Sequence, residues 1–342
     1  MQITSKQHKK IRVFIHYFLG PLLFAWVSYS IYRQVQQQPG LEKSWQHIRH
    51  SFNSGMIVNL FAVLLLMLAN WSIETIKWKL SVQKIQKINF FTAFKAVLSG
   101  VSFSVTTPNR VGEYLGRVLY MDEGNRMKAI SLTIAGSLSQ LIVTLTMGFI
   151  GLIILRFPIE GTQMISSFWL DLLLYGVAAV IFILTVFYFR LSWLVKWIDR
   201  LPGSKRYAWL IETLEGFNAT LLLQLLSLST FRFIVFIVQY YLLFRLFDVD
   251  VSLWQCWWAV SVSFLIMAVI PTIALFTDLG LRGKISLVLL GMFSGNHLGI
   301  GLTAVSIWFI NLIIPALAGS LLILGIKKII KKSNAQIGRA HV

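Results

Sequence analysis

Two short polar segments carry the residues of this chain that are best suited to chemistry. The first contains Glu113, followed four positions later by Arg117, and the second contains Asp278, followed four positions later by Arg282. Residues at this spacing lie on one face of a helix, so each acid can pair with its arginine. Guanidinium groups and the free N–H groups of a helix N-terminus both bind phosphate and other anions. The pattern therefore predicts a site for an anionic group.

Each polar segment follows a proline and contains glycine. Pro108 precedes Gly112, and Pro271 precedes Gly280. Proline interrupts a helix and glycine permits a turn or a close backbone approach, so we expect these four residues to act as structural hinges. Arg110 would lie just before the helix that starts at Gly112. The predicted substrate-binding residues are Arg110, Glu113, Arg117, Asp278 and Arg282. The alternative is that both segments are solvated loops with surface ion pairs.

The composition of the chain indicates an integral membrane protein. Its residues are 56% hydrophobic and only 13% charged, and its mean hydropathy is +0.72, whereas about 25% of the residues in a soluble domain are charged. Apolar stretches of about 20 residues, the length that spans a bilayer as a helix, recur along the chain. We expect a single transmembrane domain over residues 1–335, with full spans at about 12–32, 55–75, 128–155, 168–189, 229–247 and 299–325.

Two further apolar stretches are interrupted. They run from Phe90 to Thr107 and from Leu253 to Ile270, and each stops at a proline. Such a pattern is typical of broken or re-entrant helices, whose irregular backbone must be covered by protein or line a cavity. The net charge of +18 comes from lysines and arginines clustered between the spans. If both stretches are re-entrant, the strong basic clusters all fall on one side, which predicts cytoplasmic N- and C-termini in a cell inner membrane.

The order of span, hairpin and span occurs twice, in residues of about 55–155 and 229–325. The two units would start on opposite sides of the membrane, as in an inverted repeat; chance similarity between apolar stretches is the alternative. The predicted fold class is an all-α polytopic membrane protein with about six full spans, two broken or re-entrant hairpins and an inverted repeat. We interpret residues 336–342 as a non-native tail, because a common sequencing adapter read in frame can spell their codons.

Polar residues inside the spans are expected to form hydrogen bonds between helices. Glu74, near the end of its span, is expected to pair with Lys77 or to reach the interface. Motifs of hydrolases, metalloproteases and nucleotide-binding loops are missing from the sequence. With no cluster of Cys and His, we predict neither a cofactor nor a metal site. Because the lysines and arginines lie in short clusters between apolar spans rather than on one soluble face, we predict no nucleic-acid partner. The other polar residues of the spans are Asn70, Ser137, Ser139, Gln140, Arg232, Gln239 and Asn311.

The two interrupted segments resemble the lysylphosphatidylglycerol synthase transmembrane family, also described as flippase-like or dolichol-phosphate-glucose-synthetase-like. The first family motif is matched by Pro108, Arg110, Gly112, Glu113 and Arg117. The second motif is matched less fully: the chain keeps Pro271, Leu279, Gly280 and Arg282 but lacks the usual Pro-Gly-Gly, and Gly283 stands where the family often has an acid. Asp278 is the residue that would supply this charge.

The resemblance implies a membrane module that moves aminoacylated phospholipid between leaflets. Family members that synthesise the lipid carry an additional soluble transferase domain, and this sequence shows none. We predict a lipid transporter of flippase type that translocates a phospholipid or polyprenyl-phosphate-linked headgroup, and we do not expect an enzyme. The alternatives are a membrane enzyme or enzyme subunit in aminoacyl- or glycosyl-lipid synthesis, and a non-catalytic anchor for another envelope protein. The partner enzyme would be a glycosyltransferase or an aminoacyl-lipid synthase.

Overall fold

The computed structural model describes residues 57–105, 107, 111–161, 166–190, 218–270 and 275–323, and this part of the chain is helical and has no strands. The predicted first span at 12–32 and the predicted tail at 336–342 lie outside the described residues. Three of the predicted site and hinge residues, Pro108, Arg110 and Pro271, also lie outside them.

Five helical segments of the described part are long and apolar enough to cross a membrane. Each exceeds the roughly 20 residues that a bilayer requires, which confirms the predicted all-α polytopic class. The last of them contains a π-helical turn, Phe309–Ile313, and continues as a helix to residue 323. The first four segments contain α4 (Ile57–Val82), α7 (Arg126–Ile154), α9 (Ser167–Phe189) and α12 (Ala219–Leu246), and the fifth, His297–Ile323, begins with α15 (His297–Trp308).

Two of these helices are longer than the predicted spans. α4 was expected to end near residue 75 but continues to Val82, and α12 was expected to begin near residue 229 but begins at Ala219. The extension of α4 contains Lys77 and Trp78, which are both buried. The charge of Lys77 lowers the local hydropathy, but this charge has partners inside the protein. The helix therefore continues beyond the point where the hydropathy falls.

Both interrupted stretches form pairs of shorter helices. α5 (Phe90–Ser104) is followed by α6 (Gly112–Val118), and α13 (Leu253–Val269) is followed by α14 (Leu275–Leu290). The Asn89 side chain accepts a hydrogen bond from the Thr92 N–H at the start of α5. Ser252 and Gln255 form a capping box at the start of α13. These caps satisfy backbone donors that a helix start leaves free.

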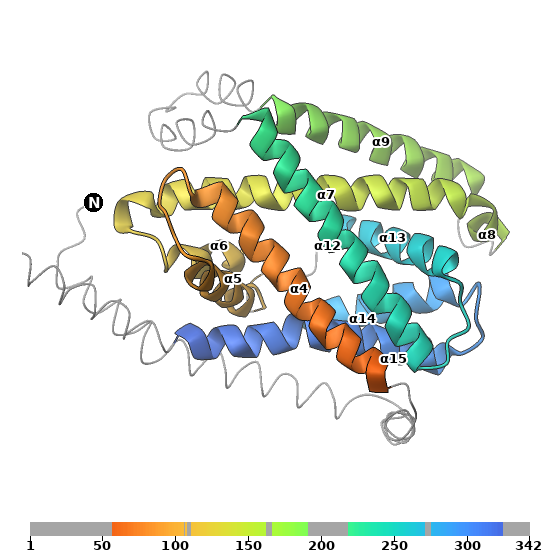
Figure 1. The fold of residues 1–342 in the computed structure, drawn as a ribbon. Coiled ribbons are helices and arrows are strands. Elements are labelled where there is room, and N and C mark those ends of the chain that lie inside the picture. The colour runs from red at the N-terminus through yellow and green to blue at the C-terminus, as the bar shows by residue number, and fades with distance from the viewer. Residues whose placement is uncertain are drawn as a thin grey trace, which may run out of the picture.

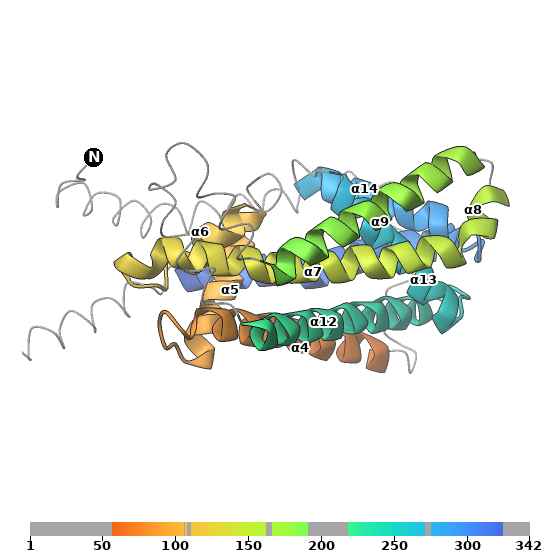
Figure 2. The ribbon, with the colours of Figure 1, turned by 90° about the horizontal axis from the view of Figure 1, so that it is seen from above.

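The long helices lie in layers, with α4 and α12 side by side along most of their length (Figures 1 and 2). α7 packs against α13 through Gly148, where an added Cβ would lie only 2.3 Å from the Cβ of Leu265. α5 meets the segment 314–323 through Gly319, where an added Cβ would lie 1.9 Å from the Leu98 carbonyl oxygen. The first short helix of each predicted repeat unit thus packs on the last helical segment of the other unit. The inverted relation of the two units stays a prediction.

Candidate functional site

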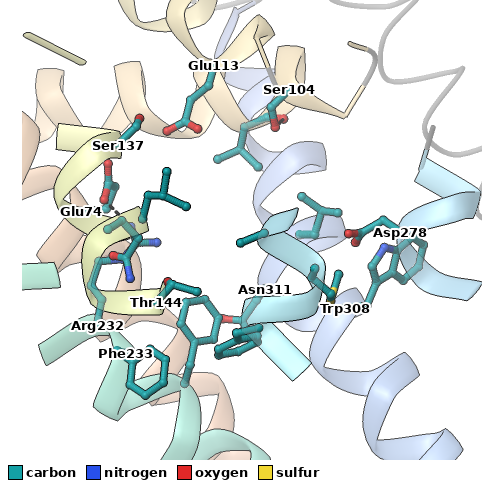
Figure 3. A pocket seen from close by; sticks show the side chains of 18 of the residues that line it. Glu74, Ser104, Glu113, Ser137, Thr144, Arg232, Phe233, Asp278, Trp308 and Asn311 are labelled. Atoms are coloured by element: carbon teal, nitrogen blue, oxygen red, sulfur yellow. Dashed lines mark hydrogen bonds and ion pairs between the residues drawn. The ribbon is translucent and has the colours of Figure 1, made fainter. Parts of the chain in front are cut away.

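A cavity of about 490 Å³ lies between the two helix pairs and the long helices. Its walls come from α4, α5, α6, α7, α12, α13, α14 and the segment around α15. Both predicted polar segments contribute, since Glu113 on α6 and Asp278 and Arg282 on α14 all line this cavity. Figure 3 shows Glu113 at the top of this cavity and Asp278 at its right. The cavity is thus lined by described residues of both polar segments.

One wall is built on Glu74 of α4, which is buried and pairs with three cations. Its Oε2 atom lies 3.0 Å from Lys77 Nζ, and its Oε1 atom lies 2.7 Å from Arg117 Nη2. Arg232 of α12 forms a third ion pair with Glu74, and Glu113 pairs with Arg117. We call these five residues the ion cluster. Its members come from α4, α6 and α12, so the cluster joins helices that are far apart in sequence.

Neutral groups hold the two arginines of the ion cluster in place. Arg232 Nε donates a hydrogen bond of 2.8 Å to Asn70 Oδ1, and the guanidinium carbon lies 5.6 Å from the centre of the Trp71 ring. The guanidinium carbon of Arg117 lies 6.0 Å from the centre of the Trp78 ring. Guanidinium groups at such distances from an indole are attracted by its π-electrons. Both guanidinium groups therefore have neutral neighbours in addition to the carboxylates.

The lysine of the ion cluster has a second partner. Lys77 Nζ donates to the Ser229 hydroxyl at 3.3 Å, and that hydroxyl is 2.9 Å from the Ser139 hydroxyl. Lys77 is only 2% exposed. This chain of contacts ties α4 to α12 and α7 at the cavity wall. The polar residues expected to link helices thus include several that also shape the site.

The ion cluster carries three cations and two carboxylates, so its formal net charge is +1. Buried charges are costly unless they are paired, and a charge at membrane depth costs about 2.5 to 3.5 kcal/mol on insertion scales. Glu74, Lys77, Glu113 and Arg232 line the cavity directly, while Arg117 reaches it through Glu113. The excess charge therefore faces a space that can hold an anion.

The opposite wall is close to neutral. Arg282 Nη2 lies 3.5 Å from Asp278 Oδ2, as the spacing of four residues predicts, and Arg282 Nη1 donates to the Tyr240 hydroxyl at 3.1 Å. Figure 3 shows the Trp308 side chain beside Asp278 on this side of the cavity. Asn311, in the π-helical turn, lines the cavity as well. This wall offers polar groups without a net charge.

The two described hinge glycines differ. Gly112 starts α6 as predicted, its N–H donates to Thr107 Oγ1 at 2.7 Å, and an added Cβ would lie 2.2 Å from the Phe103 carbonyl oxygen. Gly280 lies inside α14 with open space around its Cα, so the turn expected there does not form. A single glycine weakens a helix by only about 1 kcal/mol, and α14 continues through it.

Sequence reasoning did not include three members of the ion cluster, Glu74, Lys77 and Arg232, among the predicted binding residues. Glu74 was expected to pair with Lys77 or to reach the interface; the pair forms, but both residues are buried in the protein. Arg232 was expected to link helices, and it does so through Glu74 and Asn70 of α4, but it also lines the cavity. The available signal was charge balance: an acid in one apolar span and an arginine in another are costly apart and compensate each other together.

Among the described residues, no group of three or more His, Cys, Asp or Glu side chains could hold a metal ion. A family model described as the lysylphosphatidylglycerol synthase TM region matches residues 17–319. The matched range includes both helix pairs and the whole ion cluster. None of the curated proteins compared with the chain matches it.

Proposed function

Because the chain belongs to the lysylphosphatidylglycerol synthase transmembrane family, we propose that it is a lipid transporter of flippase type. It moves a phospholipid or a polyprenyl-phosphate-linked headgroup from one leaflet to the other. The observation that carries this proposal is the excess positive charge of the ion cluster on the wall of a cavity of about 490 Å³. A cavity of this size is in the usual range for small-molecule sites.

The phosphate of the headgroup binds at the cationic wall. Lys77 and Arg232 line the cavity, and their ammonium and guanidinium groups donate charge-assisted hydrogen bonds to phosphate oxygens. Glu113 holds Arg117 from the cavity side and is its more exposed partner, at 25% exposure against 6% for Glu74. An entering phosphate can therefore compete with Glu113 for Arg117 while Glu74 keeps the cluster together.

The walls of the cavity come from both predicted repeat units. Such an arrangement is compatible with alternating access, in which the cavity opens to one side of the membrane at a time. α4, α5, α6 and α7 supply one part of the lining, and α12 to α15 supply the other. In transporters built from inverted repeats, the substrate lies near the midplane between the repeats, and the repeats rock around it. We place the chain in a bacterial inner membrane with both termini in the cytoplasm, following the basic clusters.

Reconstitution of the full chain into liposomes with fluorescent phospholipids tests the transport proposal. We expect the chain to bring labelled lipid to the opposite leaflet, as measured by quenching of the accessible label, without changing the lipid covalently. Arg232→Gln removes charge-assisted hydrogen bonds to the phosphate and lowers the rate by about tenfold or more. Arg245→Gln is the matched control, because Arg245 lies on the same helix, is exposed and does not line this cavity.

The description of the matched family as a synthase region favours a second candidate function. In it, the chain is the membrane subunit of an enzyme that adds an aminoacyl or glycosyl group to a lipid carrier, next to a soluble synthase or glycosyltransferase. The same liposome experiment separates the two candidates. A new lipid species detected by mass spectrometry, with no movement of label between leaflets, would favour the subunit.

A further inference from the structure

The charged side chains around the cavity do not balance one another. The ion cluster has a formal net charge of +1, and the pair of Asp278 and Arg282 on the opposite wall adds none. The described residues of α5, α7, α13 and α15 that line the cavity are all neutral. Over the described residues, the cavity lining together with its ion-pair partners therefore carries one positive charge.

The described acids of the cavity wall are already used by cations. Glu74 pairs with all three cations of the ion cluster, Glu113 pairs with Arg117, and Asp278 pairs with Arg282. Uncompensated charge in a medium of low dielectric constant is costly. Compensation of the excess charge must then come from what enters the cavity. A headgroup with a single negative charge makes the loaded cavity neutral, whereas the empty cavity keeps its positive charge.

This charge lies at membrane depth. Arg232 stands almost midway along α12, which is long and apolar enough to cross a bilayer. Glu74 and Lys77 lie on α4, a second helix of this kind, and both are buried. The membrane potential acts on a charge in proportion to the part of the potential that the charge crosses. A change of access from one side of the membrane to the other therefore has an electrical component while the cavity is empty.

We infer that the membrane potential drives transport by acting on the empty cavity. This inference rests on the proposed function. With a singly charged headgroup in place, the passage across the membrane is electrically neutral, so the potential does not oppose it. After the headgroup has left, the positively charged cavity returns to the side from which it takes lipid, and a potential that is negative on that side favours the return. Each full cycle thus moves one negative charge away from the negative side.

Transport by the full chain in vesicles under a controlled potential tests the inference. Fluorescent phosphatidylglycerol, chosen for its single negative charge, is placed in the inner leaflet of phosphatidylcholine vesicles, and a potassium gradient with valinomycin makes the inside negative. We expect the label to reach the outer leaflet about fivefold faster at about 100 mV than without a potential. The orientation of the chain in the vesicle does not change this sign, because the empty cavity must return to the inner side in either case.

A change of charge in the cavity wall gives a sharper comparison. Asp278→Asn raises the charge of the loaded cavity from zero to +1, so an inside-negative potential opposes the loaded step and the acceleration should disappear. Arg282 keeps the Tyr240 hydroxyl as a partner in this variant, and its transport rate without a potential shows whether it is folded. Glu113→Gln makes the same change of charge from the other wall and should behave alike.

Asp171→Asn is the matched control. Asp171 is also the acid of an ion pair, with its Oδ1 atom 2.9 Å from Arg156 Nη2, but it does not line the cavity. This variant should keep the full acceleration.

Equal rates with and without the potential in the unmodified chain would overturn the inference, as would full acceleration in both cavity variants. A requirement for chloride in place of the potential would overturn it too, because a chloride ion in the empty cavity makes the return neutral. Movement of lipid in these three cases would leave the proposed function standing. No movement of lipid at any potential would count against the proposed function itself.

Discussion

Glu74 is the residue on which the site depends. It compensates Lys77, Arg117 and Arg232 at once, and it is buried between α4 and its neighbours. Removing one partner of a buried ion pair leaves charge without compensation in a medium of low dielectric constant. The stability of the protein and the shape of its cationic wall are therefore linked through this side chain.

We expect Glu74→Gln to destabilise the fold by about 3–5 kcal/mol, because three buried cations would then repel one another around a neutral amide. Thermal unfolding in detergent, followed by circular dichroism, measures the effect as a lower midpoint. Glu123→Gln is the control, since Glu123 is 66% exposed and lies 3.9 Å from Arg126. Equal midpoints for the two variants would contradict the central role of Glu74.

The binding role of Lys77 gives a prediction of its own. Lys77→Met should weaken binding of dihexanoyl phosphatidic acid by about tenfold, because a charge-assisted hydrogen bond to the phosphate is lost. Lys79→Met, two positions along the same helix, does not touch the cavity lining and should leave binding unchanged. Calorimetric titration of both variants gives the comparison. Unchanged affinity in Lys77→Met would place the phosphate elsewhere.

At the residue scale, sequence predicted the local pairs and missed the distant ones. The pairs of Glu113 with Arg117 and of Asp278 with Arg282 follow from helical spacing alone. The contacts of Glu74 with Arg117 and Arg232 depend on which helices become neighbours, and spacing carries no information about that. Charge balance pointed to some partner for each buried charge, but it did not identify the partner.

At the scale of elements, packing of the short helices relies on glycine. α13 approaches α7 at Gly148, where Leu265 and the Ser261 carbonyl oxygen leave no space for a side chain. The interruptions at the two polar segments were predictable, because proline and polar residues end an apolar run. The full lengths of α4 and α12 were not. The end of α4 is buried by neighbours that a hydropathy average does not include, whereas α12 begins with a partly exposed segment capped by Asn218.

Gly148→Val should destabilise the protein by about 1–3 kcal/mol, because the added methyl groups would force α7 and α13 apart. The same change at Gly176 of α9 is the matched control, as nothing lies within 4 Å of a Cβ built there. Thermal midpoints in detergent compare the two. A larger loss for Gly176→Val would show that α7 and α13 are not held at this contact.

At the scale of the whole molecule, orientation in the membrane is the open prediction. The basic clusters predict that the loop with Lys87 lies in the cytoplasm and the loop with Asp250 on the opposite side. Both residues are exposed. Cys256, the one cysteine of the sequence, is buried and should not react with a membrane-impermeant reagent.

Single cysteines at these two loops test the orientation. In intact spheroplasts, Asp250→Cys should react with an impermeant maleimide, and Lys87→Cys should react only after the membrane is opened. The unmodified chain is the control for reaction at Cys256. If both variants are labelled from outside, the two predicted repeat units begin on the same side of the membrane, and the inverted repeat is wrong.

The contact between Leu98 and Gly319 also bears on how the protein is made. α5 is synthesised early, yet its partner segment 314–323 comes at the far end of the described chain. During insertion into the membrane, the surface of α5 around Leu98 therefore stays without its partner Gly319 until nearly all of the other described helices have entered. The pair α5 and α6 therefore reaches its final packing late.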